Sequence, residues 1–212
     1  EPTGALYGVA TMLLRLLREQ RPGRIAVVRD SPGPSFRKDR YPAYKANRPA
    51  APEDLKFQLG RIGELCEAFG LTSFEAPGFE ADDLIATLTH SAREAGLKVV
   101  VVSADKDLLQ LVGEQVLMFD SMRDRVFGIP ETEAKLGVPP ERVGDLLALM
   151  GDSSDNIPGV PSVGAKTAAS LLTRWASLDE IYENLAEVER KGLRAKLEEH
   201  RDLAFLSREL VQ

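Results

Sequence analysis

The chain has 212 residues, of which 43% are hydrophobic and 28% are charged, as in an ordinary globular protein with a sizeable core. No apolar run approaches the roughly 20 residues that a membrane-spanning helix needs, so we expect no membrane partner. A single cysteine, Cys66, excludes an internal disulfide and fits a reducing, cytoplasmic location, while two histidines, His90 and His200, argue against a zinc site.

Apolar residues in the first part of the chain recur with alternating strand and helix periods. This alternation is typical of α/β proteins, so we expect a parallel-type central sheet flanked by helices. The valines of 98–102 predict a strand buried on both faces. The helical period of 53–69 predicts an inward face made of Leu55, Leu59, Ile62, Leu65, Cys66 and Phe69. Helices are predicted at 5–18, 53–69, 80–95 and 105–111, and strands at 25–28, 72–75, 98–102 and 116–119.

The remainder of the chain has helical periodicity only. We therefore expect an α/β core over residues 1–128, a helical part over 129–212, and no linker between them. Residues 31–52, the basic segment, carry five prolines and no apolar period, and they predict a long mobile loop or a marginal helix. Further helices are predicted at 130–136, 140–150, 165–175 and 178–184, with two more within 187–210.

Acidic side chains follow the predicted strands, where the sites of open α/β sheets lie. We expect carboxylates from four separate segments to meet at one edge of the sheet, although any single pair could serve only as a helix cap. Asp82 points about 200° away from Glu80 around a helix, so it would act through water or from a frayed first turn. The eight acids are Asp30, Glu80, Asp82, Asp83, Asp105, Asp107, Asp152 and Asp155.

Carboxylates that crowd together repel one another and need a cation. Oxygen ligands without His or Cys favour Mg²⁺, for which Mn²⁺ can substitute, and so many acids indicate two ions roughly 4 Å apart, as in nucleases. The net charge of −6 would be unusual for a nucleic-acid-binding protein. Without these eight acids the balance becomes slightly positive, so nucleic acid is not excluded.

Two stretches suit phosphate groups. In the basic segment, Arg, Lys and aromatic residues are interleaved between Ser35 and Arg48, which favours phosphate contacts and base stacking over a merely solvated loop. Gly159 to Gly164 forms a turn before a helix that carries Lys166 in its first turn, which indicates a grip on duplex backbone. The alternative there is a simple turn between helices, with glycine as a C-cap.

Seven motifs occur in an order that closely resembles the 5′-nuclease domain of bacterial DNA polymerase I, in the flap endonuclease superfamily. The likeness covers nearly the whole chain and is most specific in the last two motifs. They are Val27-Val-Arg-Asp, Ser35-Phe-Arg, Tyr44-Lys-Ala-Asn-Arg, Phe79-Glu-Ala-Asp-Asp, Ser103-Ala-Asp-Lys-Asp-Leu, Gly151-Asp-Ser-Ser-Asp-Asn-Ile-Pro-Gly-Val and Gly164-Ala-Lys-Thr-Ala.

The resemblance implies a Mg²⁺-dependent 5′→3′ exonuclease and flap endonuclease that acts on DNA with a 5′ flap, a nick or an RNA primer in replication and repair. It assigns the eight acids to metal binding and implies a helix–three-turn–helix at about 150–175, often with K⁺ bound. It also implies a nucleoid-associated protein with possible attached polymerase domains. Lys45 and Arg48, assisted by Arg37, would position the scissile phosphate, and the DNA-binding residues would be Tyr44, Gly159, Val160, Ser162, Gly164, Lys166 and Thr167.

The family has one more metal-ligand aspartate, on a central strand that would precede Glu1. The chain does not begin with Met, so we expect an N-terminal truncation, with a broken sheet and impaired catalysis if the molecule begins at Glu1. Arg29 also stands where the family commonly has an apolar residue. The alternatives are a non-catalytic module that binds DNA structures and an RNA-directed nuclease with similar metal ligands.

Overall fold

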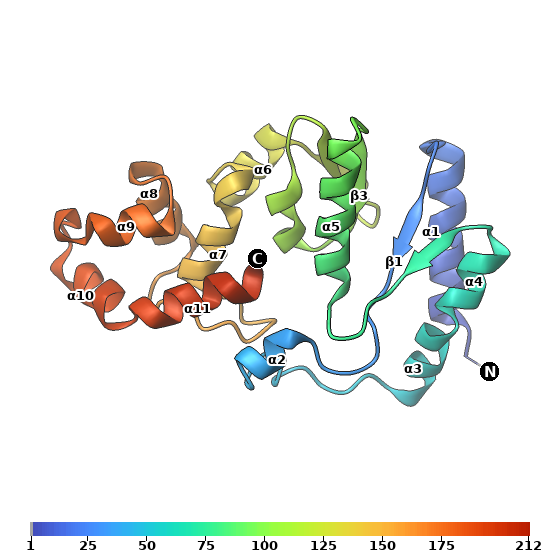
Figure 1. The fold of residues 1–212 in the computed structure, drawn as a ribbon, viewed down its shortest axis with the longest axis horizontal. Helices are drawn as coiled ribbons and strands as arrows, with labels where there is room; N and C mark the ends of the chain where they lie inside the picture. The colour runs from blue at the N-terminus through green and yellow to red at the C-terminus, as the bar shows by residue number, and fades with distance from the viewer. Residues whose placement is uncertain (1) are drawn as a thin grey trace. The chain divides into compact units, whose positions relative to one another are not determined.

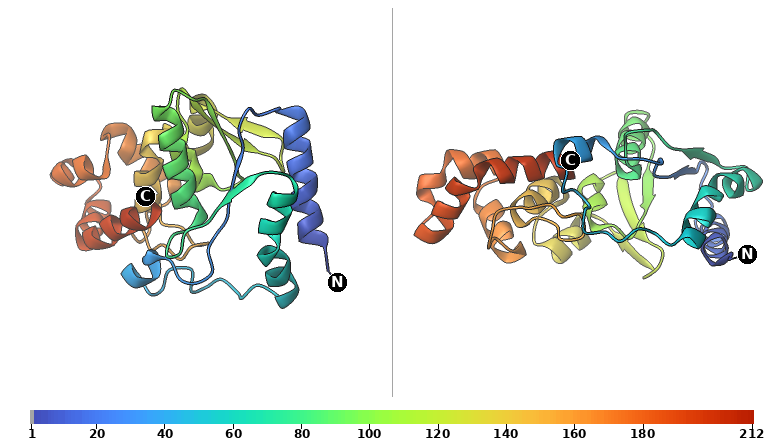
Figure 2. Two further views of the ribbon diagram at one scale, coloured as in Figure 1. Left: turned by 45° about the vertical axis from the view of Figure 1, so that its right-hand side comes forward. Right: turned by 90° about the horizontal axis from the view of Figure 1, so that it is seen from below.

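The computed structural model describes residues 2–212, and the chain divides into two compact units (Figures 1 and 2). Unit 1 comprises Glu1–Phe36 and Pro49–Ile85, and unit 2 comprises Arg37–Arg48 and Ala86–Gln212. The basic segment is therefore shared, with its middle in unit 2. The division also falls within two helices, α2 (Phe36–Arg40) and α5 (Ala81–Glu94).

Unit 1 has a two-stranded parallel sheet in which Ala26 of β1 lies opposite Thr72 of β2. Helix α1 packs on α3 and α4, and α4 packs on β2 (Figure 1). The buried apolar side chains of this unit are few, namely Leu13, Leu16 and Cys66. Its elements are α1 (Gly4–Glu19), β1 (Ala26–Val28), α3 (Glu53–Gly60), α4 (Ile62–Ala68), β2 (Thr72–Phe74) and the start of α5.

The single helix predicted at 53–69 is wrong, because Arg61 separates α3 from α4. Gly60 ends α3 and Gly63 lies in the first turn of α4, and glycine weakens a helix at such places. The predicted inward face is confirmed at Cys66 of α4, which is buried, but it is wrong in α3, since Leu55 and Leu59 are 36% and 44% exposed. The buried residue of α3 is instead Gln58, whose side-chain oxygen accepts a hydrogen bond from the Ala5 N–H at 2.8 Å.

Unit 2 has a three-stranded sheet in the order β3-β4-β5, with β3 parallel and β5 antiparallel to β4. The antiparallel strand β5, absent from the sequence prediction, forms a hairpin in which Asp120 faces Arg125. The elements are β3 (Val99–Val102), η1 (Lys106–Leu111), β4 (Val116–Asp120), β5 (Arg125–Phe127), α6 (Ile129–Leu136), η2 (Pro140–Arg142), α7 (Val143–Met150), α8 (Ala165–Arg174), α9 (Leu178–Glu183), η3 (Leu185–Glu187), α10 (Lys191–Glu199) and α11 (Arg201–Val211).

Helix α7 lies at the centre of the helical part and packs against η1, α8 and α11. Its sequence is apolar on nearly all sides, as expected of a helix that is covered all round. Leu146, Leu147 and Leu149 are almost completely buried. The end of this helix leads directly into the loop that carries Asp152 and Asp155, so a rigid core element positions those two acids.

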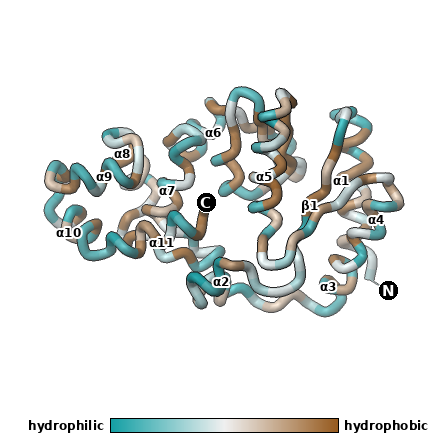
Figure 3. Tube along the Cα trace, in the orientation of Figure 1, coloured by the Kyte–Doolittle hydropathy of each residue, from teal (hydrophilic) through white to brown (hydrophobic). Residues whose placement is uncertain are grey.

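The predicted α/β fold class, with parallel strand pairing and a C-terminal helical part, is confirmed. The strands form two sheets instead of one, because no strand within residues 2–212 pairs with both β1 and β3. The prediction that 98–102 is buried on both faces is wrong: Val101 is buried, whereas Val100 is 51% exposed. Hydrophobic residues do concentrate along the strands, as Figure 3 shows for β1.

No helix within residues 2–212 is long and apolar enough to cross a membrane. This finding agrees with the absence of long apolar runs in the sequence.

Candidate active site

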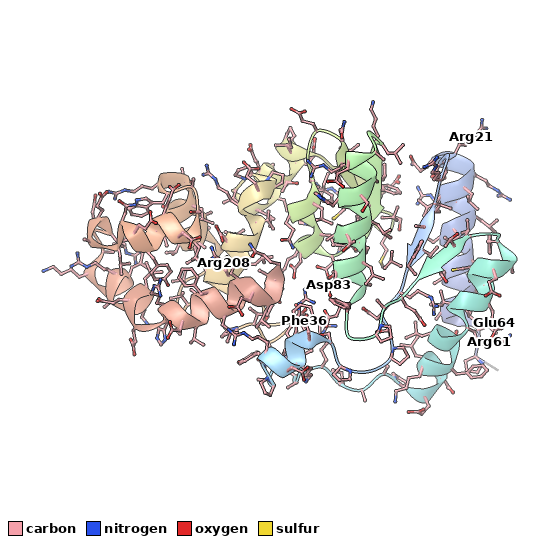
Figure 4. The ribbon with its side chains drawn as sticks, in the orientation of Figure 1. Arg21, Phe36, Arg61, Glu64, Asp83 and Arg208 are labelled. Carbon is pink, nitrogen blue, oxygen red and sulfur yellow. The ribbon has the colours of Figure 1, made fainter. Side chains whose placement is uncertain are left out.

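Three of the predicted acids gather at the start of α5 in unit 1. Asp30 accepts a hydrogen bond from the Ala81 N–H at 2.7 Å, and Asp83 accepts one from the Glu80 N–H at 2.8 Å. Glu80 in turn accepts a hydrogen bond from the Ser35 hydroxyl at 2.9 Å. Figure 4 labels Asp83 at this end of the helix. The N-terminal end of a helix favours negative charge, which lowers the cost of bringing these carboxylates together.

Asp82 lies in the same first turn of α5 and is half-buried. The sequence predicts that it points away from Glu80, and its metal-binding role stays a prediction. The bonds made by Asp30 and Asp83 are also those of helix-capping residues, so capping and ion binding are compatible at this position.

The other four acids line one pocket of about 600 Å³ in unit 2. Asp105 and Asp107 come from the junction of β3 and η1, where Asp105 caps η1 by accepting a hydrogen bond from the Asp107 N–H at 3.0 Å. Asp152 and Asp155 come from the loop after α7. The expectation that both segments deliver carboxylates to one place is met within this unit.

Asp107 is the most strongly perturbed member of this group. Burial, reinforced by the negative charges of Asp105 and Asp152, raises its pKa to about 7, against an opposing effect of Lys106. Its Oδ1 atom is buried and has no hydrogen-bond partner within residues 2–212. A buried carboxylate oxygen without a partner is costly in a folded protein, and a bound cation would satisfy it.

Asp152 already has a positively charged partner. Lys106 Nζ lies 2.8 Å from Asp152 Oδ2, and the Ser154 hydroxyl and N–H donate to Oδ1 at 2.6 and 2.7 Å. Burial acts to raise the pKa of Asp152, but the hydrogen bonds from Lys106 and Ser154 outweigh it, and the pKa is lowered. Asp152 is therefore held in its ionised form.

Asp155 is held by the middle of the basic segment. Arg48 forms an ion pair with it, Lys45 Nζ lies 3.6 Å from Oδ2, and the Tyr44 hydroxyl donates to Oδ2 at 3.1 Å. The Lys45 N–H also donates to the Asp155 carbonyl at 2.8 Å. The two residues predicted to position a phosphate, Lys45 and Arg48, thus lie beside one of the predicted metal ligands.

These observations fit a divalent ion bound by carboxylate oxygens. In neither unit, as far as residues 2–212 show, are three His, Cys, Asp or Glu side chains already close enough to hold an ion. In unit 2 the four acids are not gathered around one point, because Asp152 is paired with Lys106 and Asp155 is paired with Arg48. Asp107, with its unpartnered oxygen, is the most available ligand.

Two predicted roles in the basic segment need correction. The Tyr44 ring is 3% exposed, so it is not available to stack on a base, and its hydroxyl orients Asp155 instead. Arg37 is 4% exposed, and its guanidinium donates to the carbonyls of Leu210 and Gln212 at 2.7 and 3.3 Å. Arg37 therefore ties the segment to α11, and we leave it out of the proposed catalytic set.

The turn before α8 depends on two glycines in the left-handed region. Gly151 has φ +71° and Gly159 has φ +58°. Their backbones touch, because a Cβ on Gly159 would lie 2.3 Å from the Gly151 nitrogen. The Gly159 N–H donates to the Ser207 hydroxyl at 3.0 Å, which anchors the turn on α11. This anchoring removes that N–H group from the set that could meet a phosphate.

The exposed part of the turn lies further along. Val160 is buried and contributes only to packing, whereas Ser162 and Lys166 are exposed. Gly164 precedes α8 with open space around it, and no side chain caps the helix. The first N–H groups of α8 therefore have no intrahelical partner, and with Lys166 they form a surface suited to an anion.

Three supporting residues were not singled out from the sequence: Ser35, which donates to Glu80, and Lys106 and Ser154, which donate to Asp152. Lys106 stands between two aspartates in Asp-Lys-Asp, and Ser154 stands two residues after Asp152. The latter spacing is typical of a local turn in which an aspartate accepts backbone and side-chain hydrogen bonds, and it could have identified Ser154.

Removing the Tyr44 hydroxyl tests the support of Asp155. We expect Tyr44→Phe to slow phosphodiester cleavage by roughly tenfold with unchanged folding, because a ligand that loses a supporting hydrogen bond is less well oriented. Cleavage rates and thermal unfolding of the variant check this expectation. Tyr41→Phe in the same segment is the control, and equal rates for both variants would contradict the role of Tyr44.

Two family models cover the whole chain. One, described as a 5'-3' exonuclease, N-terminal resolvase-like domain, matches residues 1–137, and the other, described as a 5'-3' exonuclease, C-terminal SAM fold, matches residues 138–212. The chain belongs to the 5'-3' exonuclease family. Its motif resemblance is thereby confirmed, and the acids described above lie within the segments that define this family.

Relatives of this exonuclease family include both long and short proteins. A DNA polymerase I of Rhizobium leguminosarum is 47% identical over all of this chain, which spans 22% of that protein. A 5'-3' exonuclease of Aquifex aeolicus is 43% identical over 93% of this chain, which spans 68% of that protein. The chain therefore spans about a fifth of that polymerase and about two thirds of that exonuclease.

Solved structures agree with this family. The 5'-exonuclease of bacteriophage T5, with divalent zinc ions bound, matches with a TM-score of 0.87 and 26% identity over 100% of this chain and 81% of that chain. A flap endonuclease of the same phage, in a complex with DNA and metal ions, matches with a TM-score of 0.86 and 25% identity over 100% of this chain and 81% of that chain.

Proposed function

We propose that this chain is a structure-specific 5′ nuclease that uses divalent metal ions to hydrolyse phosphodiester bonds of DNA. The observation that carries the proposal is the unit 2 pocket, in which Asp107 Oδ1 is buried and unpartnered beside the negative charges of Asp105 and Asp152. Metal-bound and DNA-bound phage relatives support it. The acids at the start of α5 in unit 1 are proposed as further metal ligands.

We assign the acidic residues to metal binding and two basic residues to phosphate binding. In unit 2, Asp105, Asp107, Asp152 and Asp155 would hold Mg²⁺ or Mn²⁺, and in unit 1 the same role is proposed for Asp30, Glu80, Asp82 and Asp83. Bound ions would supply a hydroxide nucleophile at neutral pH and stabilise charge on the departing 3′ oxygen. Lys45 and Arg48 would bind the scissile phosphate, since both place positive charge beside Asp155. In the reaction, the water oxygen bonds to phosphorus as the bond to the 3′ oxygen breaks.

The duplex next to the cleavage point would lie on the start of α8. Exposed Lys166 and Ser162 and half-buried Thr167, with the free N–H groups after Gly164, would bind backbone phosphates without reading sequence. Lys196 Nζ donates to the Ser162 hydroxyl at 3.2 Å and adds positive charge there. The K⁺ ion that the family resemblance implies at this turn stays a prediction.

In the parent protein we propose removal of 5′ flaps and RNA primers during bacterial DNA replication and repair, near the nucleoid. Support comes from the polymerase I and exonuclease relatives, which are bacterial. The division into a nuclease core over 1–128 and a helical DNA-binding part over 129–212 is likewise a proposal. The two family models place the boundary between residues 137 and 138.

The direct test is cleavage of 5′-labelled flap DNA in Mg²⁺, Mn²⁺ or EDTA, with an RNA flap of the same sequence alongside. We expect release of 5′ products that requires the metal. The second candidate function is a module that binds flap DNA without cutting it. The pairing of Asp152 and Asp155 with Lys106 and Arg48, which leaves no three acids gathered in either unit as described, favours that module. Binding without cleavage in every metal would establish it.

The duplex grip has a test of its own. We expect Lys166→Ala to weaken binding of duplex DNA and to make the slope of log affinity against log salt shallower by about one, because one phosphate contact is lost. Lys98→Ala removes an exposed lysine that lines neither described pocket, and it serves as the control. An unchanged slope for Lys166→Ala would reduce this turn to a connection between helices.

A further inference from the structure

The pocket that holds the four acids of unit 2 is also lined by basic side chains. Five acidic and five basic side chains line it. Three of the basic groups are paired with acids: Arg48 with Asp155, Lys106 with Asp152, and Arg123 with Asp120. Arg125 and Lys135 form no ion pair with any residue of 2–212 that the structure describes. Two positive charges in this pocket are therefore not neutralised by an acidic side chain.

Arg125 and Lys135 are placed together by Phe127. Lys135 Nζ lies 4.5 Å and Arg125 Cζ lies 5.6 Å from the centre of the Phe127 ring. The ring is 3% exposed, whereas both basic side chains are exposed. The two side chains come from different elements, β5 and the last turn of α6. Because both cations lie against the same aromatic ring, they are held in one region of the pocket while their N–H groups stay open to solvent.

The acid that faces Arg125 across the hairpin does not neutralise it. Asp120 lies opposite Arg125 in the β4–β5 pairing. Its Oδ1 accepts the N–H groups of Met122 and Arg123, and its Oδ2 accepts Arg123 Nη1 at 2.9 Å. These hydrogen bonds, the one from the Arg123 side chain first among them, lower the pKa of Asp120. Both oxygens of the Asp120 carboxylate therefore already have hydrogen-bond donors, and the guanidinium of Arg125 is available to bind another group.

We propose that Arg125 and Lys135 form a phosphate-binding site that holds the cleaved strand beside the scissile phosphate. The inference rests on the function proposed above and adds two residues to it. A planar guanidinium and an ammonium group, fixed on one aromatic ring at the edge of an acidic pocket, suit a phosphodiester oxygen. They would also offset the repulsion between backbone phosphates and the acidic side chains of the pocket.

The experiment removes the charges and keeps the side-chain stems that cover Phe127. In R125Q/K135Q, both glutamines retain methylene groups over the ring, so the hairpin should fold normally. The matched control R93Q/K98Q removes one arginine and one lysine from exposed positions of the same unit outside the described pockets. Binding of flap DNA is measured in EDTA over a range of salt concentrations, and cleavage is measured in Mg²⁺.

For R125Q/K135Q we expect flap affinity to fall roughly tenfold and the salt slope to become shallower by about one or more. KM should rise more than kcat falls, and R125K/K135R should retain binding. A flap with one uncharged methylphosphonate next to the scissile bond should bind the unaltered chain as weakly as the normal flap binds R125Q/K135Q. R125Q/K135Q should bind the methylphosphonate flap almost as tightly as it binds the normal flap. The substitutions and the methylphosphonate remove the same contact, so their effects on affinity do not add.

Two results would overturn the proposal. If the unaltered chain cleaves flap DNA but R125Q/K135Q behaves as R93Q/K98Q does, this phosphate site is wrong and the nuclease function stands. If the unaltered chain neither binds nor cleaves flap DNA, both fall together.

Discussion

Asp107→Asn is expected to slow phosphodiester cleavage by on the order of a thousandfold and, at the same time, to make the metal-free protein more stable above about pH 7. The loss of rate follows from the loss of a ligand of the metal ion, because the bound ion would stabilise transition-state charge by several kcal/mol. The gain in stability follows from the environment of Asp107, which is buried beside Asp105 and Asp152 and has a pKa of about 7.

The direction of the pH effect follows from linkage. The pKa of Asp107 is 3.8 in an unperturbed chain and about 7 in the folded protein. Between these values the folded state binds a proton that the unfolded state has lost, so stability falls as the pH rises from about 4 to about 7 and stays low above that. The fall is of the order of 4 kcal/mol for a shift of about three pKa units. Asparagine carries no charge, so this fall should disappear.

Urea unfolding of both proteins in EDTA, between about pH 5 and pH 8, measures the effect. Adding Mg²⁺ at about pH 8 should stabilise the unaltered chain more than the variant, because a ligand that binds only the folded state stabilises it. Ser91→Asn, at an exposed position of α5, is a control for the substitution itself. A parallel loss of stability with pH in Asp107→Asn would contradict the assignment.

Gly159→Ala should destabilise the fold by roughly 3 kcal/mol and lower cleavage by about a hundredfold or more. The added methyl group would lie 2.3 Å from the Gly151 nitrogen, and alanine is strained at φ +58°. Relief requires the loop to move, and this loop carries Asp152 and Asp155. Because misplacement of a catalytic group by about 1 Å is costly, the rate should fall even where the protein still folds.

Gly164→Ala is the matched control. It stands in the same turn with φ −95°, and no atom lies within 4 Å of its added methyl group. We expect it to fold almost normally. Urea unfolding of the two variants, side by side, separates the strain at Gly159 from a general intolerance of alanine. Equal behaviour of the two would show that the Gly151–Gly159 contact is dispensable.

Much of the fold could be predicted because its elements are locally encoded. The apolar period of α1 and the valines of β3 identify their segments without reference to the rest of the chain. The break at Arg61 was missed although Gly60 and Gly63 stand on either side of it, because the apolar period continues through it. The strand β5 was missed because it has only 3 residues. The exposed face of β3 was also missed, because burial depends on neighbouring strands and helices.

The site shows the same division. The acids could be identified because strand ends in α/β proteins meet at one edge, and Asp105, Asp107, Asp152 and Asp155 do share a pocket. The partners of these acids could not, since Lys106, Tyr44 and Arg48 reach them through tertiary packing. Base stacking by Tyr44 and phosphate positioning by Arg37 were predicted from residue type alone, and the burial of both side chains argues against these roles. Arg125 and Lys135 lie outside every motif that the sequence reveals.

The contact between Gly151 and Gly159 closes the intervening loop upon itself. Hydrogen bonds join Asp152 to Ile157 in both directions, and the Asn156 side chain donates to the Ala43 carbonyl at 2.6 Å. A loop closed in this way loses its conformational entropy when the chain folds. The loop around Asp152 and Asp155 is then already ordered before a substrate binds. Less of the binding free energy is spent on ordering the loop, and more of it remains available for bending and orienting the nucleic acid.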